Sequence, residues 1–236
     1  MIKHLRENNF KIFSGSMLKL IAVLAMLADH FGAVFYNEFS FMTSPIFGTS
    51  ITLYYILRKI GRLSFPIFCF LAVEGFIHTK NRKKYGASML IFALISEIPF
   101  DLCFMKTYFD FSYQNVFFTL FLGFSVMCIL EYVKDDILKF GLALVPVFAA
   151  YFLRVDYGMV GVLLIAMLYI LKDKRPLASL IAYPFLSGGY AAWCAFLPIN
   201  MYNEKRGFIK GRYLKYAFYI FYPLHLLLLA IADRFI

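Results

Sequence analysis

The stretch MLKLIAVLAMLADHFGAVFY, residues 17–36, decides the fold. It matches the roughly 20 apolar residues that a helix needs to cross the hydrocarbon core of a bilayer. Its charged or ionisable residues are Lys19 near the start and Asp29 and His30 near the end. The stretch is longer than the apolar region of a signal peptide, and no small-residue cleavage motif follows it. We therefore expect it to remain in the protein as the first transmembrane helix.

The composition of the whole chain extends this conclusion. Of the 236 residues, 62% are hydrophobic, 20% aromatic and 16% charged. Soluble domains average roughly 45–50% apolar and about 25% charged residues, so a soluble globule is excluded, as is a disordered chain. The four cysteines lie in apolar segments without metal-ligand spacing, and we expect no metal. The remaining fold class is an all-α polytopic transmembrane helix bundle of about 8–10 helices, including short or re-entrant ones.

Apolar stretches alternate with loops that carry charges, proline or glycine. We expect a basic cytoplasmic N-terminal arm over residues 1–16 and a single transmembrane domain over 17–236. Within that domain we expect helices at 17–36, 63–79, 85–104, 115–133, 140–153, 157–171 and 213–235, and a short amphipathic stretch at 51–62. Charged turns are expected at 80–84, 134–139, 172–176 and 204–212.

Residues 177–203 admit two interpretations. The segment contains two prolines and the sequence SGG at 187–189, so it is one broken span or two short ones that meet at the glycines. With the N-terminus inside, two crossings leave more Lys and Arg in the inner loops than one crossing does. Two full spans need about 40 residues. We therefore favour a pair of short or re-entrant helices, in a multi-pass protein of the cytoplasmic membrane with its N-terminus inside.

Ionisable residues inside spans are costly and mark functional sites by default. At about 1.5 Å per helical residue, His30, Glu97 and His225 lie at one depth, near the middle of the membrane. Glu97 and Asp101 are four residues apart and share a helix face. The structural alternatives are helix-to-helix hydrogen bonding by the histidines and ion pairing of the acids.

Two arginines lie near the outer end of this region. Arg58 and Arg62 are also four residues apart, and we expect them to pair with Asp101 and Asp29, because an arginine at a membrane boundary requires a carboxylate. Glu74 lies nearer the inner face, where it can also extend to water.

A specific set of motifs accompanies these residues: LKLIA at 18–22, DHFG at 29–32, GRLSFP at 61–66, EGFIHT at 74–79, SEIPFD at 96–101, QNV at 114–116, DYG at 156–158, YN at 202–203 followed by RG at 206–207, and FYPLHL at 221–226. Together they resemble the TraX family, membrane proteins named for acetylation of the F-pilin N-terminus. The chain departs from the family where Glu204 replaces the usual glycine. That family is similar in turn to the transmembrane acyltransferases, whose histidines in the first and last helices match His30 and His225.

The resemblance implies acyl transfer from cytosolic acetyl-CoA, as a co-substrate, to an unidentified amine or hydroxyl acceptor such as a peptide N-terminus, a glycan or a small molecule. His30 is the expected general base. Successive helical side chains point about 100° apart, so Glu97 is a better partner for His30 than Asp29. His225 or Tyr222 is expected to stabilise the thioester oxyanion. The full set of expected catalytic residues is His30, Asp29, Glu97, Asp101, His225 and Tyr222.

The net charge of +10 suits the anionic CoA and an anionic lipid bilayer, and no soluble basic domain is present that would bind nucleic acid. The expected substrate-binding residues are Arg58, Arg62, Glu74, His78, Arg82, Lys83, Lys84, Asn115, Asn203, Lys205 and Arg206. Two rival functions remain open. Midplane acids and broken helices also occur in proton-coupled transporters, although no internal repeat is evident here. A non-enzymatic pilus or envelope assembly factor is the third possibility.

Overall fold

The computed structural model describes residues 11–209 and 211–235. Throughout these residues the regular elements are helices, joined by loops with isolated β-bridges. Four stretches are long and apolar enough to cross a membrane: Gly15–Val34, Leu53–His78, Arg82–Met105 and Tyr216–Phe235. The expected all-helical membrane bundle is therefore confirmed.

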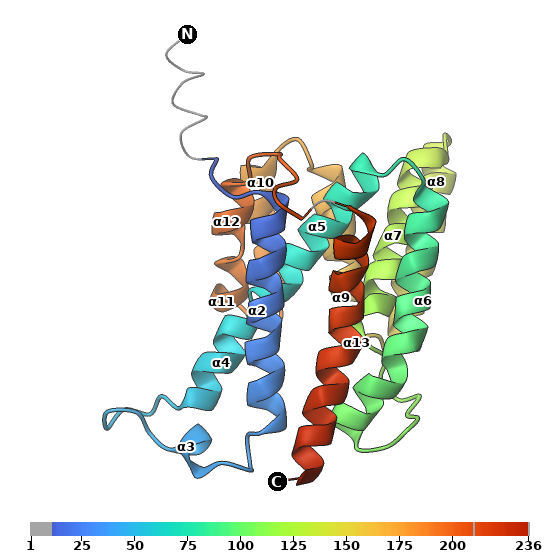
Figure 1. The fold of residues 1–236 in the computed structure, drawn as a ribbon. Helices are drawn as coiled ribbons and strands as arrows, with labels where there is room; N and C mark the ends of the chain where they lie inside the picture. Colours follow the sequence, from blue (N-terminus) through green and yellow to red (C-terminus); the bar gives the residue numbers. More distant parts are fainter. Residues whose placement is uncertain (1–10, 210, 236) are drawn as a thin grey trace, which may run out of the picture.

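Figure 1 shows the elements in chain order. They are α2 (Gly15–Val34), α3 (Ser40–Thr43), α4 (Leu53–Gly61), α5 (Ser64–His78), α6 (Arg82–Phe100), the π-helical turn η1 (Asp101–Met105), α7 (Val116–Tyr132), α8 (Asp136–Phe152), α9 (Gly158–Ile170), α10 (Arg175–Ile181), the 3₁₀ turn η2 (Tyr183–Phe185), α11 (Tyr190–Trp193), α12 (Phe196–Asn200) and α13 (Arg212–Phe235). Most of the expected helices agree with these bounds to within three residues.

Two expected boundaries are wrong, and capping explains both. Residues 136–139, expected in a charged turn, open α8, because the Asp135 side chain accepts a hydrogen bond from the Leu138 N–H and caps the helix. Residues 15 and 16, expected in the N-terminal arm, begin α2, because Ser14 caps it by accepting from the Met17 N–H. Residues 1–10 of the arm lie outside the described residues.

The segment 177–203 enters and leaves the bundle on the same side. Arg175 Nη1 donates to the Tyr202 carbonyl over 3.0 Å, so the two ends of the segment meet. The Phe13 N–H donates to the Met201 carbonyl at 3.1 Å, which fixes both ends beside the start of α2. We call residues 175–202 the re-entrant hairpin. Its two short arms, α10 and α12, lie at the N-terminal end of the bundle, and α11 reaches about half its height (Figure 1). The favoured pair of short re-entrant helices is therefore confirmed.

The tip of the hairpin abuts the junction of α4 and α5. A Cβ added to Gly188 would lie 2.8 Å from the Arg62 Cβ, so only glycine allows this close approach. The junction itself is a bend in an otherwise continuous stretch, with Gly61 buried at the end of α4 and Ser64 opening α5.

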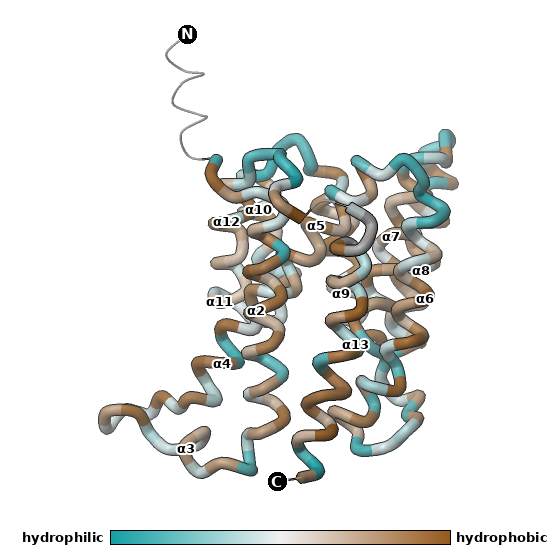
Figure 2. Tube along the Cα trace, viewed as in Figure 1, coloured by the Kyte–Doolittle hydropathy of each residue, from teal (hydrophilic) through white to brown (hydrophobic). Residues whose placement is uncertain are grey.

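Helices α2 and α13 run in the same direction. At one end Ser16 Oγ accepts from the Ile209 N–H at 2.8 Å, and near the other end His30 meets His225. The start of α2 and the end of α13 therefore lie at opposite ends of the bundle (Figure 1). Fully buried Leu18, Phe76 and Leu226 belong to the core that α2, α5 and α13 share with α7 and α9. Figure 2 shows hydrophilic loops gathered at the N-terminal end and hydrophobic residues along the helices.

Candidate functional site

The first and last long helices bring two histidines together. His30 Nδ1 of α2 lies 2.7 Å from His225 Nε2 of α13. The two rings are parallel to within 4°, with centroids 5.0 Å apart, so they meet edge to edge through these nitrogens. His225 is 4% exposed. The expected common depth of the two histidines is confirmed, and we call them the histidine pair.

The remaining hydrogen bond of the histidine pair fixes where its protons lie. His225 Nδ1 is 2.8 Å from the Phe221 carbonyl, and a carbonyl can only accept, so Nδ1 carries the proton. In the neutral pair His225 Nε2 then accepts, and His30 Nδ1 donates to it. His30 Nε2 is consequently the nitrogen that carries a lone pair. His225 uses both ring nitrogens, so this arrangement does not leave it free to bind an oxyanion as expected.

Aromatic rings surround the histidine pair. Phe104 of η1 packs edge-on against His30 at 5.3 Å between centroids, and Tyr222 lies 6.3 Å from the same ring. The Phe221 ring lies parallel to His225 at 4.9 Å. Tyr222 is itself buried. These rings leave His225 buried and His30 half-buried, and the less polar surroundings strengthen their hydrogen bond.

Asp29, the neighbour of His30 in α2, faces a different helix. Its Oδ2 accepts from Arg58 Nη1 at 2.7 Å, as one of the expected arginine pairings requires. The close approach depends on Gly61, because a Cβ there would lie 2.2 Å from Asp29 Oδ1. The prediction that the Asp29 and His30 side chains do not pair with each other therefore agrees with the geometry.

Glu97 and Asp101 do not have the partners that we expected. The Glu97 carboxylate accepts from Asn115 Nδ2, an amide that also donates to the Ala93 carbonyl at 2.8 Å. Asn115 caps α7 through its Oδ1, so α6 contacts the capping side chain and not His30. The Asp101 carboxylate accepts from the Asp110 N–H at 2.9 Å, because the turn η1 directs it toward the following loop rather than toward an arginine.

Asp156 was not selected from the sequence, although it opens the DYG motif at 156–158. Tyr113 donates its hydroxyl hydrogen to Asp156 Oδ1 over 2.8 Å. Arg62 and Asp29 lie within electrostatic reach of the same carboxylate. Burial raises the pKa of Asp156 to about 6, against the opposing effect of the Tyr113 hydrogen bond. An acid in the short turn between two apolar helices is the signal that could have found it.

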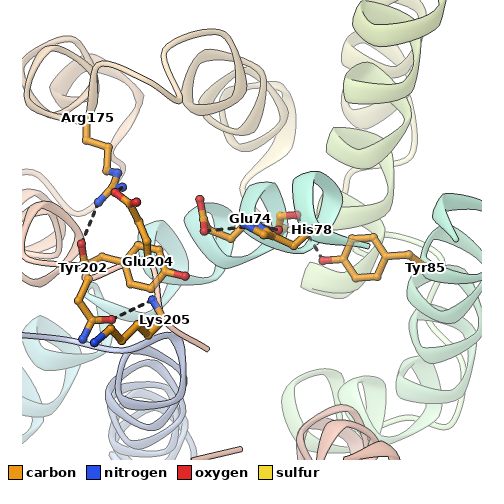
Figure 3. A network of polar contacts seen from close by, with 9 residues as sticks. Glu74, His78, Tyr85, Arg175, Tyr202, Glu204 and Lys205 are labelled. Atoms are coloured by element: carbon orange, nitrogen blue, oxygen red, sulfur yellow. Dashed lines mark hydrogen bonds and ion pairs between the residues drawn. The ribbon is translucent and has the colours of Figure 1, made fainter. Parts of the chain in front are cut away.

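The expected donor-binding residues gather at the N-terminal end of the bundle. Figure 3 shows Arg175 beside Glu204 and Tyr202, with the Lys205 N–H bonded to Asn203 Oδ1 at 3.0 Å. Arg175 holds the pKa of Glu204 below its usual range.

Three further expected binding residues, Glu74, His78 and Arg82, lie at the end of α5 and the start of α6. The Glu74 carboxylate lies 3.8 Å from His78 Nδ1. Arg82 is engaged by Glu131 at 3.0 Å and by the Tyr132 hydroxyl at 2.8 Å, so it is less available to a ligand than expected. Among the expected donor-binding cations, Lys83, Lys84, Lys205 and Arg206 are exposed.

An all-helical membrane protein whose first and last long helices meet at a pair of histidines is the class that this fold and site define. The model of the family described as TraX protein matches residues 14–232, and the chain belongs to this family. It is 30% identical to the probable fimbrial assembly protein FimC, serogroup H1, of Dichelobacter nodosus, over 95% of this chain and 97% of the relative. It is also 28% identical to an uncharacterized protein of Rickettsia prowazekii, over 52% of this chain and 39% of the relative. No solved structure matches.

Proposed function

We propose that this protein transfers an acetyl group from acetyl-CoA to an amine or hydroxyl acceptor within the membrane. The observation that carries the proposal is the histidine pair, in which His30 Nδ1 lies 2.7 Å from His225 Nε2. This hydrogen bond leaves the lone pair of the His30 ring on Nε2. A lone pair held in this orientation suits a general base, and membership of the TraX family supports acyl transfer as its chemistry.

In the proposed reaction the acetyl group moves from the CoA sulfur to the acceptor, and one proton moves from the acceptor to that sulfur. The acceptor nitrogen or oxygen attacks the thioester carbonyl carbon, and His30 Nε2 takes the proton that the acceptor loses. The C–S bond then breaks, and His30 returns the proton to the departing sulfur, giving the acetylated acceptor and free CoA. His225 positions His30 and shares the positive charge during the step, through the bond to His30 Nδ1. Tyr222, whose ring centroid lies 6.3 Å from that of His30, remains the proposed hydrogen-bond donor to the thioester carbonyl oxygen.

The donor is proposed to enter at the N-terminal end of the bundle. The exposed cations there, including Lys205 and Arg206, can bind the CoA phosphates. The pantetheine arm, roughly 15–20 Å long, can span the distance from that face to His30. The positive-inside rule supports a cytoplasmic location for this face, so the proposal includes an inner membrane enzyme with its N-terminus inside.

The D. nodosus relative carries the name of a fimbrial assembly protein, and this supports a role for the present chain in pilus-related acylation. A membrane-embedded or surface-bound polypeptide amine is the class of acceptor that this name favours. The alternative of an assembly factor without enzymatic activity draws support from the same name, and the following experiment separates the two.

Purified protein in nanodiscs is incubated with radiolabelled acetyl-CoA and a panel of amine and hydroxyl acceptors, and release of free CoA thiol is followed together with transfer of label. We expect thiol release that depends on the acceptor and disappears in His30→Gln, a variant that can still donate a hydrogen bond to His225. Wild-type turnover in His30→Gln would overturn the proposal. Absence of thiol release by wild-type protein that binds acetyl-CoA would favour the assembly factor.

A further inference from the structure

A polar cavity lies between α4 and the tip of the re-entrant hairpin, apart from the basic loops. Its volume is about 230 Å³, and we call it the arginine pocket. It is lined by Tyr54, Tyr55, Arg58, Lys59 and Arg62 on one side and by the tip of the re-entrant hairpin, residues 187–188, on the other. Among the described residues that line it, every charged one is a cation.

The re-entrant hairpin explains why the pocket exists. Its tip at Gly188 contacts Arg62 and then turns back, so it covers only part of the bundle on this side. Tyr55, near the start of α4, is half exposed, and α4 follows the loop that leaves the far end of α2. The arginine pocket therefore extends from the hairpin tip toward the C-terminal end of the bundle, opposite the basic loops. Cations at membrane depth require water or a counter-ion, and this opening supplies access to both.

The cations of the pocket are only partly neutralised by the protein. Arg58 pairs with Asp29 at 2.7 Å, and Arg62 lies within electrostatic reach of Asp156. Lys59 has no carboxylate partner among the described residues, and its ammonium lies 5.1 Å from the centroid of the Tyr55 ring. The three cations of the pocket therefore exceed the two nearby carboxylates, Asp29 and Asp156, by one positive charge.

We propose that the arginine pocket binds an anionic group, a phosphate or a carboxylate, of the acceptor substrate. This inference rests on the proposed function. Arg58 bonds to Asp29, the residue next to His30, and Gly61 also lies against Asp29, so the pocket adjoins the turn of α2 that carries the proposed base. The donor and the acceptor then approach the histidine pair from opposite faces of the membrane, and the acceptor reacts through an amine or hydroxyl group distant from its anion.

The first test measures binding with acetyl-CoA omitted, so that it is independent of catalysis. Labelled O-phosphoethanolamine is equilibrated with the full chain in nanodiscs of zwitterionic lipid. We expect binding that inorganic phosphate displaces and that ethanolamine, the same amine without the anion, does not. Lys59→Gln and Arg62→Gln should each weaken it about tenfold, the loss expected for one charge-assisted hydrogen bond. The control is Lys134→Gln, an exposed lysine in the loop at the opposite face.

Three results would overturn the proposal: displacement by ethanolamine as effective as that by phosphate, binding unchanged in both pocket variants, or binding abolished when phosphatidylglycerol is added to the nanodisc. The last result would identify the pocket as a lipid headgroup site. If transfer to every acceptor fails while this binding behaves as expected, the proposed function is wrong and the anion site stands.

The second test uses transfer kinetics and sidedness. In Lys59→Gln the KM for O-phosphoethanolamine should rise about tenfold while the KM for acetyl-CoA stays constant, because only the acceptor is bound there. A cysteine at position 59 should react from outside intact cells with an impermeant thiol reagent, in a background that lacks the exposed Cys194. A cysteine at position 205 should not. Labelling of the cysteine at position 205 but not of that at position 59 would show that the basic loops face outward and would overturn the proposed sidedness.

Discussion

Asp29 and His30 are consecutive in α2, yet they belong to two different regions of the molecule. His30 joins the histidine pair, where its polar partner is another neutral ring and the walls are aromatic. Asp29 joins the arginine pocket, where its partner is a cation and the cavity admits water. The difference follows from the roughly 100° between successive side chains on a helix. One turn of α2 can therefore hold a histidine among aromatic rings and a carboxylate beside a cationic pocket.

The largest expected effect breaks the histidine pair. His30→Ala should lower turnover about 10³-fold, the typical contribution of a general base, and leave the thermal unfolding of the bundle close to that of the wild type. The measurement is steady-state CoA thiol release by the purified variant in nanodiscs. A variant that keeps more than a tenth of wild-type turnover would remove His30 from the mechanism. His225→Gln should lose less activity than His30→Ala, because it affects the position of His30 and not the base itself.

The next effect concerns the charge pair at the edge of the arginine pocket. Arg58→Gln leaves the partly buried Asp29 without its cation and should cost about 3 kcal/mol of unfolding free energy. Adding Asp29→Asn should restore most of that loss, because no unpaired charge remains. Chemical denaturation of the wild type, both single variants and the double variant gives the coupling energy. Equal destabilisation of Arg58→Gln and the double variant would show that the arginine acts through packing alone.

The free energy of unfolding should also depend on pH, through Asp156. Because burial raises the pKa of Asp156 to about 6, the folded state holds this proton more tightly than the unfolded chain. The stabilisation is therefore complete below pH ~4, the usual aspartate range, and is lost as the pH rises through 6. We expect the wild type to lose about 3 kcal/mol of stability across this window. Asp156→Asn should not show this loss, while the exposed Asp173→Asn should behave as the wild type; identical profiles for both variants would refute the assignment.

The smallest expected effect lies at the opposite face. Lys205→Gln combined with Arg206→Gln should raise the KM for acetyl-CoA about fivefold with kcat unchanged, since these exposed cations would bind a remote part of the donor. Michaelis–Menten titration of acetyl-CoA measures this, with Lys134→Gln as the control. An unchanged KM would mean that the loop serves only to set topology.

Hydropathy predicted most helix bounds, because the bilayer imposes both length and polarity on each span. It failed where a local hydrogen bond decides the boundary, as at Asp135, whose capping role is hidden within a run of charges. Charge counting also predicted that the segment 177–203 turns back, since the positive-inside rule constrains loops and not helices.

The site was predictable in part. The spacing of His30 and His225 from the ends of their helices gave their common depth. The partner of Glu97 could not be foreseen, because Asn115 lies near it only after α6 and α7 pack together. The arginine pocket could not be foreseen either, since it depends on how far the re-entrant hairpin reaches before it turns at Gly188.

The histidine pair also has a consequence for biosynthesis. Its two residues are 195 positions apart in the chain, while Asp29 and Arg58 are separated by only 29. On the ribosome, Asp29 can find its arginine soon after α2 enters the insertion machinery. His30 must wait until α13 emerges. A nascent chain therefore forms the Asp29–Arg58 ion pair long before the histidine pair is assembled. Premature termination would leave a membrane-resident product without the histidine pair and without the proposed activity.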